Sequence, residues 1–191
     1  LRQAQGGPEQ LVDILDLGCG TGLIGPLLRP MAAMLGGVDL SAAMIAKASE
    51  RKVYDQLHVG DMIDMLKRAP KTFDLLVAAD SLIYLGDLAP VLEAAQVALR
   101  PGGLFIFTLE HAVTAEPGVE YRPELHGRYS HRREYVERQL AAAGLVGDLA
   151  EADLRLESGV PVPGLVVRAS KPTAGARASG GEQGARCGAQ A

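Results

Sequence analysis

The 191-residue sequence has few of the features that build disulfide frameworks, metal sites or nucleic-acid interfaces. Its two cysteines, Cys19 and Cys187, fit neither a disulfide framework nor a zinc site. Because 19 Lys and Arg face 23 Asp and Glu, no basic surplus is available to neutralise a phosphate backbone. No apolar run approaches the roughly 20 residues of a membrane span, and no acidic cluster has metal-ligand spacing. These absences predict a cytoplasmic protein with no metal, no membrane and no nucleic-acid partner.

The two ends of the chain lead to separate expectations. The chain starts at Leu1, with about a dozen residues before the first expected strand, which predicts that an upstream cover for the site is missing. A hydrophobic content of 48% supports one domain, over residues 1–171. Residues 172–191 are small or polar, and they bury too little apolar surface to offset the entropy of ordering. This tail is therefore expected to be disordered.

Short apolar runs alternate with helical patterns, which is typical of βα units around a parallel sheet. Strands are expected over residues 12–17, 35–40, 56–59, 73–78 and 104–109, and helices from about residue 22 and over residues 41–52, 62–68, 88–99 and 130–143. Ser41 and Ser130 are the expected N-caps of two of these helices. Residues 110–129 are expected to be irregular, and residues 153–157 and 165–169 to pair antiparallel around a loop.

The most informative segment is the glycine-rich turn Asp16-Leu17-Gly18-Cys19-Gly20-Thr21-Gly22, which follows the first strand. Glycines let a backbone approach a ligand closely, and such turns bind either a dinucleotide or S-adenosylmethionine. Gly20-x-Gly22-x-x-Gly25 matches the dinucleotide pattern, in which a helix N-terminus binds a pyrophosphate. Asp16 favours S-adenosylmethionine, because a carboxylate repels a pyrophosphate and attracts an ammonium and a sulfonium group. Asp39 fits both ligands, because an acid there can accept hydrogen bonds from ribose hydroxyls.

Five ordered blocks resemble the class I S-adenosylmethionine-dependent methyltransferases over residues 12–170. They are the glycine turn, Val38-Asp39-Leu40-Ser41, Gly60-Asp61-Met62, Phe73-Asp74-Leu75-Leu76-Val77 and Leu99-Arg100-Pro101-Gly102-Gly103. Three further segments resemble a bacterial branch whose methyltransferase domain follows tetratricopeptide repeats, although no repeat is present here. They are Gly25-Pro26-Leu27-Leu28-Arg29-Pro30, Tyr84-Leu85-Gly86-Asp87-Leu88 and Gly127-Arg128-Tyr129-Ser130-His131. The resemblance implies an α/β fold with a doubly wound, Rossmann-like, seven-stranded sheet, mostly parallel with an antiparallel strand from a C-terminal hairpin.

The resemblance also implies S-adenosylmethionine as cofactor and a set of residues around it. Gly18, Gly20 and Gly22 would lie against its methionine and ribose parts, with Cys19 as a small side chain inside the turn and Asp16 near the ammonium group. Asp39 would accept from the ribose hydroxyls, Leu40 and Met62 would lie against the adenine, Asp61 would accept from its amine, and Asp80 would face the methyl group. Two of these residues have simpler alternatives, since Asp16 could only stabilise the turn and Asp61 could only cap a helix.

No general base stands out in the sequence. Glu110, His111, Tyr84 and His131 are candidates for contact with the methyl acceptor, although each histidine could equally have a surface or capping role. The chain lacks the Asn-Pro-Pro-Tyr and Pro-Cys blocks of DNA methyltransferases, so the expected acceptor is a small molecule or a carrier- or protein-bound group. Two alternatives remain open: a catalytically inactive S-adenosylmethionine-binding or scaffold module and, more remotely, an NAD(P)-dependent oxidoreductase.

Overall fold

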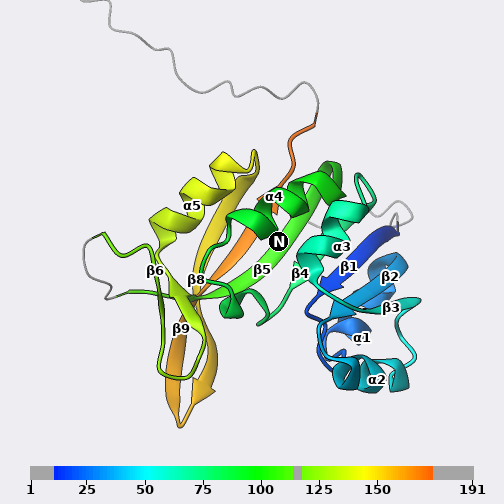
Figure 1. Cartoon of the computed structure of the whole chain (residues 1–191), viewed down its shortest axis with the longest axis horizontal. Helices are drawn as coiled ribbons and strands as arrows, with labels where there is room; N and C mark the ends of the chain where they lie inside the picture. Colours follow the sequence, from blue (N-terminus) through cyan, green and yellow to red (C-terminus); the bar gives the residue numbers. More distant parts are fainter. Residues whose placement is uncertain (1–10, 114–117, 174–191) are drawn as a thin grey trace, which may run out of the picture.

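Five parallel strands form the central part of the sheet in the computed structural model, which describes residues 11–113 and 118–173. They are β1 (Val12–Leu17), β2 (Ala32–Asp39), β3 (Gln56–Val59), β4 (Phe73–Ala78) and β5 (Leu99–His111). Their spatial order is β3-β2-β1-β4-β5 (Figure 1). The chain therefore runs outward from β1 to β3 and then restarts at β4 on the other side of β1. Such a reversal of strand order leaves a crevice at the carboxyl ends of β1 and β4.

A C-terminal hairpin completes the expected seven-stranded sheet. The hairpin consists of β8 (Val146–Glu157) and β9 (Val160–Ser170), and β9 lies antiparallel between β5 and β8. The doubly wound, mostly parallel fold with an antiparallel C-terminal strand is thus confirmed. The expected loop between the two strands is wrong, because β9 already begins at Val160. Ser158 and Gly159 both have positive φ, 51° and 81°, and a two-residue turn of that kind closes a hairpin directly.

Two short strands differ from the expectation for this region: one lies inside the segment expected to be irregular, and the other begins at its last residue. They are β6 (Tyr121–Pro123) and β7 (Tyr129–His131), and β7 runs parallel to the end of β5. They bring the described part of the sheet to nine strands. Ser130 belongs to β7, where its hydroxyl lies 2.5 Å from Glu124 Oε1, so its prediction as a helix N-cap is wrong. The following helix, α5 (Arg133–Ala142), begins three residues later.

Helices cover both faces of the sheet. α1 (Gly25–Leu28) and α2 (Ala42–Glu50) lie on one side, and α3 (Met62–Arg68), α4 (Ala89–Ala98) and α5 lie on the other (Figure 1). Single 3₁₀ turns follow α1 and β4, as η1 (Arg29–Met31) and η2 (Leu82–Tyr84). Ser41 caps α2 as expected, because its hydroxyl accepts the N–H of Met44. Within the described residues, no helix combines the length and the apolar character needed to cross a membrane. Most of the tail, residues 174–191, and residues 1–10 lie outside the described part.

Candidate cofactor site

A cavity of about 610 Å³ lies at the carboxyl ends of β1, β2 and β4, where the strand order reverses. Nine of the ten predicted cofactor residues line it: Asp16, Gly18, Cys19, Gly20, Asp39, Leu40, Asp61, Met62 and Asp80. The tenth, Gly22, does not line it and instead lies against the ring of Tyr54. Residues from three sequence motifs and from the end of β4 thus share one cavity, as the resemblance implied.

The glycine turn packs tightly on one side and is open on the other. The N–H groups of Gly18 and Cys19 both donate to the carbonyl of Val38, at 2.8 and 3.0 Å, which joins the turn to β2. Gly18 has φ +66°, and a Cβ there would lie 2.5 Å from the Cβ of Ser81. A Cβ on Gly20 would meet nothing within 4 Å. Gly18 is therefore needed for close packing, whereas Gly20 presents bare backbone to the cavity.

Asp39 bridges the glycine turn and the start of α2. Its Oδ2 accepts the N–H of Gly20 at 3.0 Å, and its Oδ1 accepts the N–H of Ser41 at 2.8 Å. The two backbone groups fix the carboxylate at the cavity wall while each oxygen keeps a further lone pair. A carboxylate held in this way is suited to accept hydrogen bonds from a pair of ribose hydroxyls.

Asp16 is almost fully buried, with 1% of its surface exposed. Its Oδ2 accepts the hydroxyl hydrogen of Tyr54 at 2.7 Å. Burial raises the pKa of Asp16 to about 6; the Tyr54 hydrogen bond opposes this rise, and the nearby charge of Asp39 adds to it. Tyr54 lies outside every motif that the sequence displays, so its contact with Asp16 could not be anticipated. A buried carboxylate at the cavity wall is a favourable site for a cationic group, because a low-dielectric surrounding strengthens the attraction.

Asp61 caps α3, which is the simpler of its two predicted roles. Its Oδ1 accepts the N–H groups of Ile63 and Asp64, at 2.8 and 3.0 Å. The same residue lines the cavity, so a ligand contact through Oδ2 is compatible with the cap. The two roles can be separated by mutation.

We expect Asp61→Ala to lower the free energy of unfolding by about 1 kcal/mol, because the cap is lost. Asp61→Ser retains a capping hydroxyl but has no carboxylate, and it should keep nearly all of the stability. If Asp61 also binds the cofactor, both variants weaken binding of S-adenosylhomocysteine in calorimetry. Wild-type affinity in the serine variant would limit Asp61 to the capping role.

Asp80 connects the cavity to a network of ion pairs. It has φ +52°, its N–H donates to the hydroxyl of Thr108 at 3.0 Å, and its Oδ1 lies 3.6 Å from Nη1 of Arg155.

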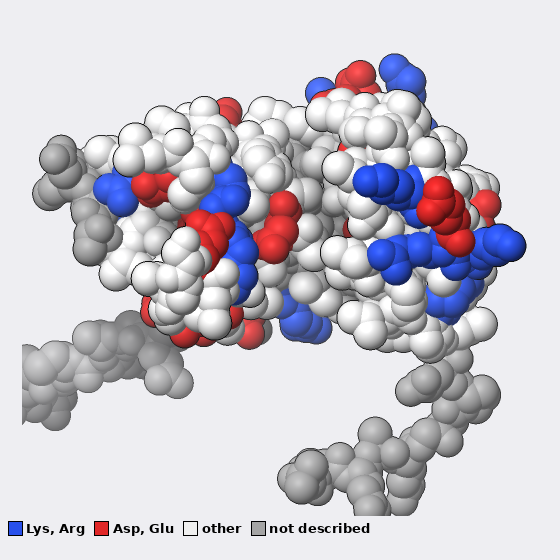
Figure 2. All heavy atoms as spheres, turned by 90° about the horizontal axis from the view of Figure 1, so that it is seen from below, with Lys and Arg blue, Asp and Glu red and all other residues white. Residues whose placement is uncertain are grey.

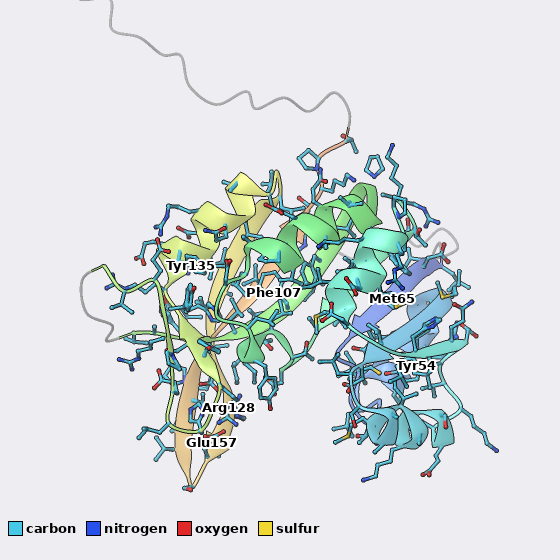
Figure 3. The ribbon with its side chains drawn as sticks, viewed as in Figure 1. Tyr54, Met65, Phe107, Arg128, Tyr135 and Glu157 are labelled. Atoms are coloured by element: carbon cyan, nitrogen blue, oxygen red, sulfur yellow. The ribbon has the colours of Figure 1, made fainter. Side chains whose placement is uncertain are left out.

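Arg155 also pairs with Glu110 and Glu157, and Arg128 pairs with the same two glutamates. Arg128, from the connection between β6 and β7, lies next to Glu157 in the lower part of the β8–β9 hairpin (Figure 3). Acidic and basic side chains lie side by side on the half of the surface that holds this hairpin (Figure 2).

The four candidates for acceptor contact are placed very differently. Tyr84, on η2, is 62% exposed and lines the cavity. Glu110 is buried within the ion-pair network, and His111, at the end of β5, does not line the cavity. His131 is fully buried, with Nε2 3.0 Å from the carbonyl of Gly86, and burial lowers its pKa. Of these four candidates, only Tyr84 therefore lies where a molecule in the cavity could reach it.

The charge of the cavity wall distinguishes between the two candidate ligands. Four aspartates and no Lys, Arg or His occur among the described lining residues: Asp16, Asp39, Asp61 and Asp80. α1 has only four residues, so its N-terminus offers little dipole to a phosphate group. A wall of this charge repels a pyrophosphate and attracts an ammonium or sulfonium group. The donor set therefore fits S-adenosylmethionine better than a dinucleotide.

Comparisons with known proteins agree with this fit. A family model described as "Methyltransferase domain" matches residues 15–107. A curated ubiquinone biosynthesis O-methyltransferase of Xylella fastidiosa is 29% identical over 154 residues, which are 75% of this chain and 61% of that protein. The chain thus spans about three fifths of that relative's length.

Solved structures share the fold at lower sequence identity. An S-adenosylmethionine-dependent methyltransferase of Mesorhizobium loti superposes with a TM-score of 0.67 at 23% identity, over 86% of this chain and 93% of that one. A [4+2]-cyclase superposes with a TM-score of 0.69 at 19% identity, over 87% and 76%. None of these matches is named as a tetratricopeptide-repeat protein, so that finer resemblance stays a prediction. The methyltransferase-domain model thus matches the part of the chain that bears the cavity, and the fold is that of solved S-adenosylmethionine-dependent methyltransferases.

Proposed function

We propose that this chain binds S-adenosylmethionine in the cavity and, in the cytoplasm, transfers its methyl group to a small-molecule or a carrier- or protein-bound acceptor. The observation that carries the proposal is the cavity wall, where four carboxylates and no cationic side chain meet the bare backbone of the glycine turn. The wall has partners of the right kind for an ammonium group and for ribose hydroxyls. The same wall disfavours the NAD(P) alternative.

Four residues of the wall would bind or orient parts of the cofactor. Asp16 would bind the ammonium group, Asp39 the ribose hydroxyls, and Leu40 and Met62 would supply apolar surface for the adenine. When bound, the cofactor supplies a methyl group that its sulfonium activates for in-line displacement. The protein then contributes alignment and exclusion of water, which can account for much of such a rate enhancement.

The acceptor is expected on the side of the cavity formed after β4. Asp80, Tyr84 and Leu85 line it there, so a phenol is available to bind or orient an acceptor and a carboxylate is available to receive its proton. The curated relatives are named for O-methylation in ubiquinone biosynthesis, which makes an oxygen acceptor the first class to test.

A specific observation favours one competing function. A protein named as a cyclase has the same fold, and among the described residues no histidine or lysine lines the cavity to act as a general base. The chain could therefore bind the methyl donor without transferring its methyl group, as an inactive or scaffold module.

Incubation with S-adenosylmethionine carrying a labelled methyl group and with fractionated metabolites and proteins tests the proposal. The expected result is transfer of label to one class of acceptor, with S-adenosylhomocysteine formed in equal amount. The Asp39→Ala variant serves as the matched control and should transfer much less. Tight binding of the methyl donor without transfer to any fraction would favour the inactive module instead.

A further inference from the structure

Tyr54 brings a hydroxyl group to the buried end of β1 from a distant loop. It lies between α2 and β3, beside β2, and its side chain points toward the glycine turn (Figure 3). Its hydroxyl donates to Oδ2 of Asp16 at 2.7 Å. Within the described residues this is the only hydrogen bond that the Asp16 carboxylate receives. The other oxygen, Oδ1, is therefore left for the cavity that Asp16 lines.

The ring of Tyr54 is held in place by three glycines. A Cβ on Gly22 or on Gly25 would lie 2.8 Å from ring atoms of Tyr54, and a Cβ on Gly37 would lie 3.2 Å from one. Gly22 and Gly25 are two members of the GxGxxG pattern that suggested a dinucleotide. In this fold they provide space for an aromatic ring instead of a close approach to a pyrophosphate. Because the ring is confined, its hydroxyl reaches Asp16 at little further entropic cost.

Apart from the Tyr54 hydroxyl, the described groups close to Asp16 do not stabilise the negative charge of its carboxylate. Asp39 lies close enough to repel it, and the buried thiol of Cys19 on the adjoining turn offers no positive charge. The charge of Arg51 acts on Tyr54, and its Nε donates to the carbonyl of Thr21 at 2.6 Å. Burial and Asp39 both disfavour the charged form of Asp16, and the Tyr54 hydrogen bond favours it.

We infer that Tyr54 is a positioning residue for the methyl donor: its hydroxyl orients the Asp16 carboxylate and stabilises the charged form that the donor's ammonium group requires. The inference rests on the proposed function, because it assigns the partner of Asp16 within the same cavity. Neither the glycine turn nor the other four motifs include Tyr54.

The protonation of Asp16 should make binding of the methyl donor depend on pH. The pKa of Asp16 is raised to about 6, so the carboxylate takes up a proton and loses its charge as the pH falls through that value. Affinity for a ligand with an ammonium group should therefore fall below about pH 6 and level off above it. Loss of the Tyr54 hydroxyl should raise the pKa of Asp16 further and move this transition toward higher pH.

Calorimetric titration of S-adenosylhomocysteine at several pH values between 5 and 7.5 tests the inference. In Tyr54→Phe we expect a midpoint higher by about one pH unit, and therefore affinity about threefold below wild type near pH 6.5 and less than about twofold below it at pH 7.5. Incorporation of 3-fluorotyrosine at position 54, whose more acidic phenol is a stronger hydrogen-bond donor, should move the midpoint to lower pH.

Two control variants complete the experiment. Asp16→Asn should remove the pH-dependent transition. Tyr121→Phe, at a tyrosine that does not line the cavity, should match wild type.

The possible failures can be told apart. Wild-type midpoints in both Tyr54 variants would overturn the inference and leave Tyr54 with a packing role only. The fluorinated variant keeps the ring in place, so it decides the question even if Tyr54→Phe does not fold. Absence of S-adenosylhomocysteine binding by the wild-type protein at every pH would instead overturn the proposed function.

Discussion

Replacing Gly18 with alanine should lower the free energy of unfolding by about 2 to 5 kcal/mol. Two costs add up. Gly18 has φ +66°, a conformation that costs a residue with a side chain roughly 1–2 kcal/mol. The new Cβ would also lie 2.5 Å from the Cβ of Ser81. Ser81 cannot easily move away, because its hydroxyl donates to the carbonyl of Leu17 at 2.7 Å, and overpacking of this kind costs about 1–3 kcal/mol.

Urea denaturation of the purified protein measures the effect, with Gly60→Ala as the matched control. Gly60 lines the same cavity, and a Cβ there would meet nothing within 4 Å. Its replacement should change stability by no more than about 0.5 kcal/mol. Equal stability of the two variants would show that the glycine turn does not pack against the end of β4 as described.

Asp39→Ala should raise the dissociation constant of S-adenosylhomocysteine by about tenfold to a hundredfold, which corresponds to roughly 1–3 kcal/mol. The ribose hydroxyls lose their acceptor. The N–H groups of Gly20 and Ser41 also lose theirs, so the glycine turn is no longer fixed to the start of α2. Calorimetric titration at a single pH of about 7.5 is sufficient to detect a change of this size.

Two further variants serve as controls for Asp39→Ala. Asp39→Asn retains one oxygen as an acceptor and should lie between wild type and the alanine variant. Asp148→Ala removes an exposed carboxylate on β8, outside the cavity, and should bind as wild type does. A dissociation constant for Asp39→Ala within twofold of wild type would exclude Asp39 as the ribose ligand.

Local sequence signals were sufficient for the parts of the fold that bear the cofactor residues. β1, β3, β4 and α3 have the predicted bounds. β1 and β4 are apolar runs, α3 is a capped helix, and β3 is a short segment that ends at Gly60-Asp61. The predicted cofactor residues lie at or just after the carboxyl ends of β1, β2, β3 and β4, and these ends share one edge of a parallel sheet. This geometry explains why nine of them share one cavity. It could be predicted without any knowledge of side-chain contacts.

Contacts between distant segments could not be predicted in this way. Tyr54 and Asp16 are 38 positions apart, and their hydrogen bond depends on how the loop after α2 packs on the turn. Likewise, Arg155 reaches Asp80 only because β9 places β8 near β5. β5 also begins earlier than predicted: its register against β4 shifts between Phe73 and Leu75, so the strand passes through Pro101-Gly102-Gly103 as an irregularity.

Calorimetric titration of the wild-type protein with S-adenosylhomocysteine and, separately, with NAD and NADP tests the central claim most directly. The charge of the cavity wall predicts saturable, one-to-one binding of S-adenosylhomocysteine and no heat with either dinucleotide. Binding of a dinucleotide without binding of S-adenosylhomocysteine would contradict the account of the cavity and of the glycine turn that forms it.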